Sequence, residues 1–364
     1  MSSETASKSF RPINLEFLAK GGGESFDIFI QSDSENFVKF ASTEPKHQDK
    51  VLRLLEEGEI DQDFFIKEED LFKYYHFATQ SLRSVMDNPD VPVKTKTKKV
   101  YEVSKGVMKE FFSYNASSKI LESSEEVMEM MEECLSTADA GFAGISQITS
   151  KDYYTHTHSV NVGLYCMTFG TKVRLPKEDV KQLGFGGMLH DVGKSKVDAD
   201  LINKNGRLNE EEFERIKVHS SLGAEMLADM CCYKDIVIAM AGQHHEKYKG
   251  GGYPQGLSGD EISMHARICK IMDVYDALTT RRSYKKALNT METLTLMTRQ
   301  MADDFDPKLL ELFIKVKGPT MTWFISNFCR LIKQPFLTYK KFRGQCCYMV
   351  APGMYMVPSG VWWE

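Results

Sequence analysis

The segment from Met188 to Lys194 reads Met-Leu-His-Asp-Val-Gly-Lys. His190 and Asp191 are adjacent and Lys194 follows three residues later, so an imidazole, a carboxylate that can bridge two cations and a phosphate-seeking ammonium lie close together. By itself the segment also fits a helix end with a capping aspartate and an exposed lysine. The rest of the chain decides between these interpretations.

More histidines and acidic residues lie before and after this segment, at positions that helical spacing predicts to lie on separate helices. The candidate metal ligands are His158, His190, Asp191, His219, His244, His245 and Asp273. If Asp191 bridges, this set offers about four contacts to each of two metals and leaves about two octahedral positions on each for water or substrate. A hydroxide bridging the metals would then attack a phosphodiester. Imidazole and carboxylate ligands without cysteine favour iron or manganese, with zinc left open.

Composition limits the class of protein. The 364 residues are enough for two domains with connecting helices, and the net charge of -5 argues against a partner of duplex nucleic acid. Eight cysteines without a Cys-x-x-Cys motif indicate a reducing compartment and buried thiols. The polar N-terminus and the lack of a long apolar run predict a cytoplasmic protein with no transmembrane segment.

Periodicity divides the chain into four parts and predicts an α+β fold, a small N-terminal α/β module followed by an all-α bundle. The predicted parts are 1–90, a regulatory or docking module; 91–140, connecting helices; 141–318, the helical bundle; and 319–364, an aromatic and basic tail. In the module we expect strands at 26–30, 37–40 and 64–66 and helices at 50–57 and from the acidic turn 67–70 to about 88. A helical stretch from 100 to 137 breaks near 114–118, and its second helix opens at Ser123. The lysine run at 94–99 is interpreted as a solvated face, with a contact for anionic ligands as the alternative.

A second motif makes the interpretation specific. Residues 244–254 read His-His-Glu-Lys-Tyr-Lys-Gly-Gly-Gly-Tyr-Pro. Together with the His-Asp segment, this motif resembles the HD-GYP family of cyclic-di-GMP phosphodiesterases, a branch of the HD phosphohydrolases. Similar segments continue in order at 154–159, 217–223, 266–268, 273–279, 282–285 and 305–307.

The resemblance implies a role for each motif residue. One metal would be held by His158, His190, Asp191 and Asp273, and the other by Asp191, His219, His244 and His245. Catalytic roles fall to Asp191, Lys194 and Tyr253, and substrate contacts to Lys194, Tyr253, Arg282 and Lys285. Some relatives bind a third metal through a glutamate where this chain has Tyr154, so we expect two metals. Asp276 is expected to orient a ligand, and His156 and His265 are expected to be structural.

The implied reaction is hydrolysis of cyclic-di-GMP to pGpG, with a further cut to GMP left open. Two alternatives remain: a cyclic-di-GMP-binding signalling or docking protein with little turnover, and a hydrolase of another cyclic dinucleotide. Implied partners are a diguanylate cyclase (GGDEF) or another signalling protein, with a homodimer as an open alternative.

Overall fold

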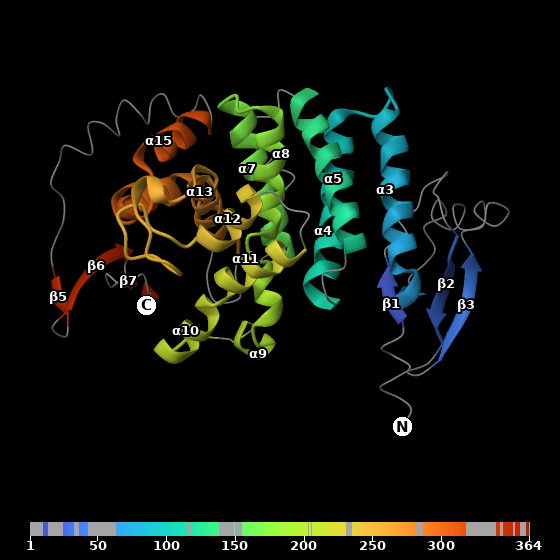
Figure 1. Ribbon diagram of the computed structural model, residues 1–364, viewed down its shortest axis with the longest axis horizontal. Coiled ribbons are helices and arrows are strands. Elements are labelled where there is room, and N and C mark those ends of the chain that lie inside the picture. The colour runs from blue at the N-terminus through green and yellow to red at the C-terminus, as the bar shows by residue number, and fades with distance from the viewer. Residues whose placement is uncertain are drawn as a thin grey trace.

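The molecule runs from a small sheet through a layer of long helices to a larger group of packed helices (Figure 1). The computed structural model describes residues 10–13, 25–32, 36–42, 63–114, 118–137, 149, 155–202, 204, 206–230, 235–281, 287–317, 340–342, 345–351, 354–356 and 362–363. This part is mostly helical and has a small antiparallel sheet near the N-terminus. These contents agree with the predicted α+β class. The predicted helix at 50–57 lies outside the described residues.

The N-terminal sheet has four antiparallel strands in the order β1-β4-β2-β3. Its strands are β1 (Phe10–Ile13), β2 (Asp27–Gln31), β3 (Phe37–Ser42) and β4 (Phe64–Lys67). The last three confirm the predicted strands, whereas β1 was not predicted because it is short and contains Pro12. Proline lacks a backbone N–H, and β1 tolerates it as an edge strand.

Helix α3 (Leu71–Asp87) follows the acidic 3-10 turn Glu68–Asp70 and covers one face of the sheet, as predicted from the turn. Tyr74 and Phe77 of α3 pack edge-on against Phe26, with ring centroids 6.1 Å and 5.9 Å apart. These aromatic contacts join the sheet to the helical layer.

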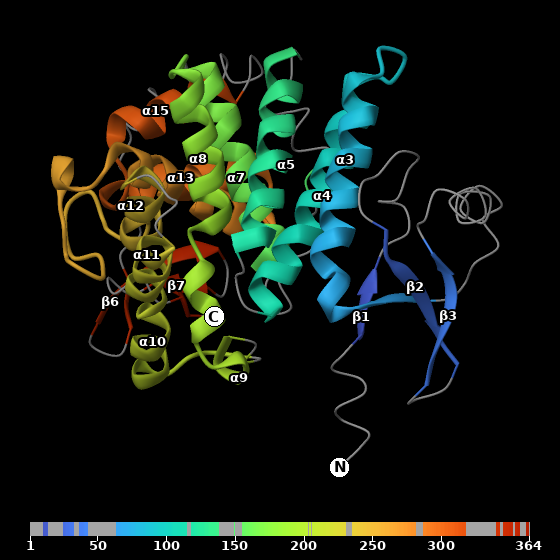
Figure 2. The ribbon, with the colours of Figure 1, turned by 45° about the vertical axis from the view of Figure 1, so that its right-hand side comes forward.

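Two antiparallel helices, α4 (Val93–Tyr114) and α5 (Ser118–Thr137), lie between α3 and the rest of the molecule (Figure 2). The predicted break between them is confirmed, but both helices begin earlier than predicted. Pro92 directly precedes the first turn of α4, where a missing N–H costs nothing. Ser123 is buried inside α5, so the predicted helix start there is wrong. In the lysine run, Lys94, Lys98 and Lys99 are exposed, as predicted for a solvated face.

Between residues 155 and 317, the regular elements that the structure describes are helices, joined by turns and loops. The longer helices are α7 (Thr155–Lys172), α8 (Lys177–Leu189), α10 (Glu210–Lys217), α11 (His219–Asp229), α12 (Asp235–Gln243), α13 (Met264–Thr279), α14 (Thr290–Arg299) and α15 (Pro307–Val316), with the 3-10 turn η3 (Val192–Lys196) after α8. At the centre, α7 and α8 pack closely because Gly163 and Gly187 face each other. A Cβ on Gly187 would lie 2.8 Å from the Gly163 Cα, so glycine permits this approach.

Four short strands near the C-terminus, which we did not predict, form a second antiparallel sheet. They are β5 (Lys340–Phe342), β6 (Gln345–Ala351), β7 (Met354–Met356) and β8 (Trp362–Trp363). Within the described ranges, every helix is too short or too polar to cross a bilayer.

Candidate metal centre

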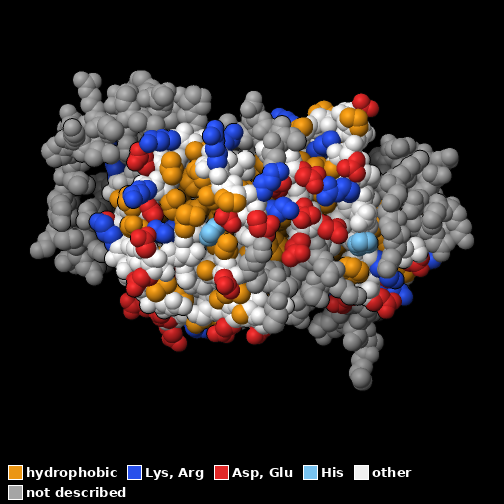
Figure 3. Space-filling view, turned by 45° about the horizontal axis from the view of Figure 1, so that its top comes forward, with side chains coloured by type: hydrophobic (Ala, Val, Ile, Leu, Met, Phe, Trp, Pro, Cys, Tyr) orange, Lys and Arg blue, Asp and Glu red, His pale blue; other side chains and the backbone are white. Residues whose placement is uncertain are grey.

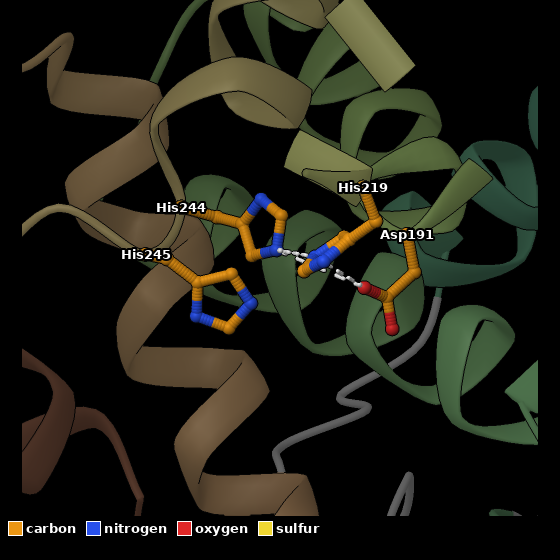
Figure 4. Close-up of side chains that lie close together, drawn as sticks. All are labelled: Asp191, His219, His244 and His245. Atoms are coloured by element: carbon orange, nitrogen blue, oxygen red, sulfur yellow. Dashed lines mark hydrogen bonds and ion pairs between the residues drawn. The ribbon is translucent and has the colours of Figure 1, made fainter. Parts of the chain in front are cut away.

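The structure brings all seven predicted ligand residues together in two adjoining groups. The ligand atoms of Asp191, His219, His244 and His245 lie within 4.8 Å of one another, as do those of His158, His190 and Asp273. Figure 4 shows the side chains of the first group pointing toward a common space. Their arrangement therefore fits the predicted centre for divalent metals, while the role of each residue as a ligand stays a prediction.

Six of these residues lie in the first turn of a helix or beside a helix end, and Asp273 lies within α13. His158 lies in the first turn of α7, and Asp273 lies on α13. His190 and Asp191 follow directly after α8, His219 begins α11, and the His244-His245 pair follows α12. Residues at helix ends are free of the regular backbone pattern on one side, so neighbouring side chains can face the same point.

Three of the histidines have their Nδ1 atoms next to backbone carbonyls of the preceding turn. The pairs are His190 with the Gly187 oxygen (2.7 Å), His219 with Ile216 (2.7 Å) and His244 with Ala241 (2.9 Å). A carbonyl only accepts, so each Nδ1 carries a proton and donates it. This arrangement orients Nε2 of each ring toward the centre, as is usual for metal-binding histidines.

Several atoms that face the centre are poorly matched within the protein. Nε2 of His244 lies 3.4 Å from Nε2 of His219, although the Nδ1 protons of both rings are already used. Among the described residues, His190 Nε2 and Asp191 Oδ1 are buried without a hydrogen-bond partner. Buried polar atoms are rarely left unpaired. A cation in each group would bind these atoms, with His190 in one group and Asp191, His219 and His244 in the other, so the residues present fit metals.

The charges of the site agree with this conclusion. Burial raises the pKa of Asp191, yet Lys194 and His190 lower it well below its usual value, and His158 does the same for the pKa of Asp273. Burial and neighbouring imidazoles hold the pKa of His244 well below its usual value. Ionised carboxylates and a neutral imidazole are the forms that bind metals.

His158 and His190 behave differently from His244. Burial lowers the pKa of His158, but hydrogen bonds with Asp273 and Asp276 outweigh it and raise that pKa to about 9. Burial also lowers the pKa of His190, and the charge of Asp191 raises it to about 9. A metal that binds these two rings therefore has to displace protons.

Asp276 lies behind His158 and belongs to neither ligand group. Its Oδ2 is 2.7 Å from His158 Nδ1, while His158 Nε2 is 3.1 Å from Asp273 Oδ1. A carboxylate in this place fixes the ring orientation of a ligand histidine. His156 and His265 are absent from both groups of described residues.

The two described substrate-contact candidates lie at the rim. Lys194 of η3 places its Nζ 2.5 Å from Asp191 Oδ2, so its present partner is a candidate ligand. The Tyr253 ring stacks on His245, with centroids 4.6 Å apart and planes 20° apart. Burial raises the pKa of Tyr253, so the phenol keeps its proton and can donate it in a hydrogen bond. Arg282 and Lys285 lie outside the described residues.

A model of the HD domain family matches residues 120–309, which is more than half of the chain. The chain belongs to the HD domain family. This match and the relatives below confirm the resemblance that the sequence motifs predicted.

Curated relatives match about half of this chain. A cyclic di-GMP phosphodiesterase of Pseudomonas aeruginosa is 37% identical over 175 residues, 47% of this chain and 41% of that protein. The 3′3′-cGAMP-specific phosphodiesterase 3 of Vibrio cholerae is 34% identical over 176 residues, 48% of this chain and 37% of that protein. The matched region thus spans less than half of either relative.

A solved structure of a HDG"Y"P protein from Bdellovibrio bacteriovorus has the same fold. It aligns with a TM-score of 0.61 and 16% sequence identity, covering 84% of this chain and 98% of the other. The likeness therefore extends beyond the HD domain to most of the chain.

Glu246 holds the loop that carries Tyr253, a role that we did not predict. Its carboxylate is buried, and Oε1 accepts hydrogen bonds from the backbone N–H groups of Gln255 (2.7 Å) and Gly256 (3.0 Å). Gly252 packs so closely on Glu246 that a Cβ would lie 2.5 Å from the Glu246 Cα. An acidic residue directly after two candidate ligands and before a glycine-rich run was the sequence signal for this role.

Hydrogen bonds to the backbone of Asp303 and Asp304 hold the same loop at a second place. The Tyr248 N–H donates to the Asp304 carbonyl (3.2 Å), and the Lys249 N–H donates to the Asp303 carbonyl (3.1 Å). An ion pair between Lys247 and Asp304 (3.1 Å) adds to them. The loop is therefore held in place before any substrate arrives.

Proposed function

We propose that this protein hydrolyses cyclic di-GMP at the candidate metal centre. The observation that carries the proposal is the convergence of buried, unpartnered nitrogen and carboxylate atoms on one space in an HD domain. The names of relatives as cyclic di-GMP phosphodiesterases support the choice of substrate.

The proposed cofactor is a pair of divalent ions, iron or manganese, held by the seven residues of the two groups. When bound, such ions supply Lewis-acid stabilisation of phosphoryl charge and a water that is nucleophilic at neutral pH. The chain supplies the orientation, because Nδ1 bonds at His190, His219 and His244 direct the rings inward.

Residues at the rim would bind the phosphodiester. Tyr253 keeps its phenol proton and would donate it to a phosphoryl oxygen near His245. Lys194 would neutralise charge that develops on the phosphoryl group, with Arg282 and Lys285 as further cationic contacts. Water adds to phosphorus as the P–O3′ bond breaks, which gives linear pGpG, and a second cut would give GMP.

A second candidate substrate is 3′3′-cGAMP. Three relatives from Vibrio cholerae are 3′3′-cGAMP-specific phosphodiesterases, at 34%, 33% and 31% identity over 176, 155 and 169 residues. This substrate differs from cyclic di-GMP in one base, so the phosphodiester chemistry would be the same.

The same proposal includes the four parts of the chain predicted from the sequence. It also includes a signalling partner, such as a GGDEF diguanylate cyclase, and a homodimer. We infer that residues 1–90 regulate or dock, and that the HD domain is the hydrolytic part of the chain.

The test is purification without oxygen, metal analysis, and a turnover assay that separates pGpG from GMP with both dinucleotides as competing substrates. We expect about two equivalents of iron or manganese and faster hydrolysis of cyclic di-GMP. A metal-loaded protein that binds the dinucleotide without forming product would overturn the proposed hydrolase activity. It would favour a cyclic-di-GMP-binding protein with little turnover. If 3′3′-cGAMP is hydrolysed faster than cyclic di-GMP, the proposed substrate would be 3′3′-cGAMP instead.

A further inference from the structure

A buried hydrogen-bond chain runs from α4 to the metal centre. The Tyr101 hydroxyl on α4 donates to Asn161 Oδ1 (2.7 Å), and Asn161 Nδ2 donates to Asp276 Oδ1 (3.0 Å). The other Asp276 oxygen lies 2.7 Å from Nδ1 of His158. All four residues are at most 1% exposed, so water does not compete for these bonds.

The direction of these bonds explains why the hydroxyl matters. A side-chain amide has one accepting and one donating end, and the two are nearly identical in shape. Because the Tyr101 hydroxyl donates to the oxygen, the amide nitrogen of Asn161 faces the Asp276 carboxylate. If the amide turned around, two oxygens would face each other, and Asp276 would lose a donor.

We propose that Tyr101 is a positioning residue for His158, acting through Asn161 and Asp276, and that α4 thereby sets the metal affinity of the group containing His158. The inference rests on the metal centre of the proposed function. It assigns a role to a helix that contributes no ligand among the seven candidates.

The position of α4 makes this link consequential. The helix packs against α7, which carries His158, and against α3, which covers the N-terminal sheet. On the α3 side, the Tyr75 hydroxyl donates to the Gly106 carbonyl of α4 (3.0 Å). A shift of α4 would therefore change the position of His158, and it could start at the N-terminal part, which we infer to regulate or dock.

The first test is Tyr101→Phe, which removes one oxygen atom and keeps the ring. Loss of an outer-shell partner typically weakens metal binding about 10- to 100-fold, and we expect this range for Asp276→Asn. The Tyr101 hydroxyl is two hydrogen bonds away from Asp276, so we expect its loss to raise the dissociation constant for manganese about 3- to 10-fold. The affinity for manganese is measured by competition with a chelator, without reference to turnover.

Tyr75→Phe is the matched control. It removes the hydroxyl of another buried tyrosine that bonds to α4, but that hydroxyl is not part of the chain to His158. We expect both variants to lower the melting temperature of the metal-free protein by similar amounts, and only Tyr101→Phe to change manganese affinity. Equal affinities in the two variants would overturn the inference.

A double variant tests the route. If Tyr101 acts through Asp276, Tyr101→Phe should have no further effect in an Asp276→Asn background, whereas independent effects would multiply. Multiplying effects would refute the route through Asp276. Should Tyr101→Phe fail to fold, Asn161→Ala breaks the same chain from α7 and should weaken manganese binding by at least as much.

The outcomes separate this inference from the proposed function. A wild-type protein that binds manganese without hydrolysis would refute the function, and the affinity comparison would still decide the role of Tyr101. Hydrolysis with unchanged affinity in Tyr101→Phe would refute the inference alone. A wild-type protein that binds no divalent metal would refute both.

Discussion

At the scale of single residues, Asp191 is the candidate ligand whose buried carboxylate depends most on neighbouring cations. Its Oδ2 lies 2.5 Å from Lys194 Nζ, and its Oδ1 lies 3.3 Å from His219 Nε2, a nitrogen whose ring already donates through Nδ1. The carboxylate is buried and ionised at once. Such a group is costly unless cations surround it on both sides, so Asp191 should be the most sensitive position of the site.

Replacing Asp191 with asparagine tests this expectation. Asp191→Asn keeps the shape but removes the charge, and we expect it to lower metal content and to reduce kcat/KM by more than about 100-fold, which exceeds the usual cost of losing an outer-shell partner. The control is Asp198→Asn, at an exposed carboxylate paired with Arg215, which should leave both quantities unchanged. Full metal content in a folded Asp191→Asn protein would contradict its role as a ligand.

The two raised histidine pKa values predict how metal binding responds to pH. Without metal, His158 and His190 have pKa values of about 9, so at neutral pH each ring holds a proton that a metal has to displace. Apparent affinity should therefore rise from pH 6 to about 9, by about tenfold per pH unit for each displaced proton. Calorimetry in buffers of different ionisation enthalpy measures the released protons. An affinity that stays constant over this range would rule out the displacement.

At the scale of elements, the loop between α12 and α13 is held on two sides. The Glu246 carboxylate accepts hydrogen bonds from the loop just after Tyr253. The carbonyls of Asp303 and Asp304 accept hydrogen bonds from the loop before it. This arrangement places Tyr253 against His245 before substrate binds, which reduces the cost of ordering the site.

Removal of the Glu246 carboxylate should loosen this loop. Glu246→Ala leaves the N–H groups of Gln255 and Gly256 without their acceptor, and we expect faster hydrogen exchange at both amides. A displacement of Tyr253 by about 1 Å should lower kcat about 100-fold while metal content stays the same. Glu261→Ala is the control, because it removes a carboxylate of the same loop that, among the described residues, bonds to Ser258 and not to Gln255 or Gly256. Unchanged exchange at Gln255 and Gly256 would show that the backbone bonds suffice.

The elements also show what sequence could predict. The α3 helix and the break between α4 and α5 follow from local patterns, and the seven candidate ligands follow from motifs whose order the fold preserves. The contacts of Tyr101 with Asn161 and of Glu246 with Gln255 could not be predicted, because they depend on how distant segments pack. Strand β1 is paired with β4 across about fifty residues of chain, and no local pattern reports such a pairing.

At the scale of the whole molecule, the candidate ligands come from α7, α8, α11, α12 and α13 or from the residues beside them. An unfolded chain cannot present them together, so a metal should bind the native state alone. Free metal at 100 times its dissociation constant would then stabilise the fold by about 2.7 kcal/mol.

Metal removal should therefore lower the melting temperature of the wild-type protein. We expect a chelator to cause a clear decrease that added manganese reverses, and we expect a much smaller decrease in Asp191→Asn. Scanning calorimetry with and without chelator measures the difference. Equal melting temperatures for loaded and stripped wild-type protein would mean that metal binding is not coupled to folding.

His190 and Asp191 are neighbours in the chain but belong to different groups of candidate ligands. A single peptide unit joins them and keeps their Cα atoms about 3.8 Å apart. This covalent link fixes the separation of the two Cα atoms, whatever the helices around them do. Asp273 and His219 are brought to the centre by the packing of separate helices. We therefore expect a movement of one helix to remove a ligand from one group, and so to lower its metal occupancy, before it separates His190 from Asp191.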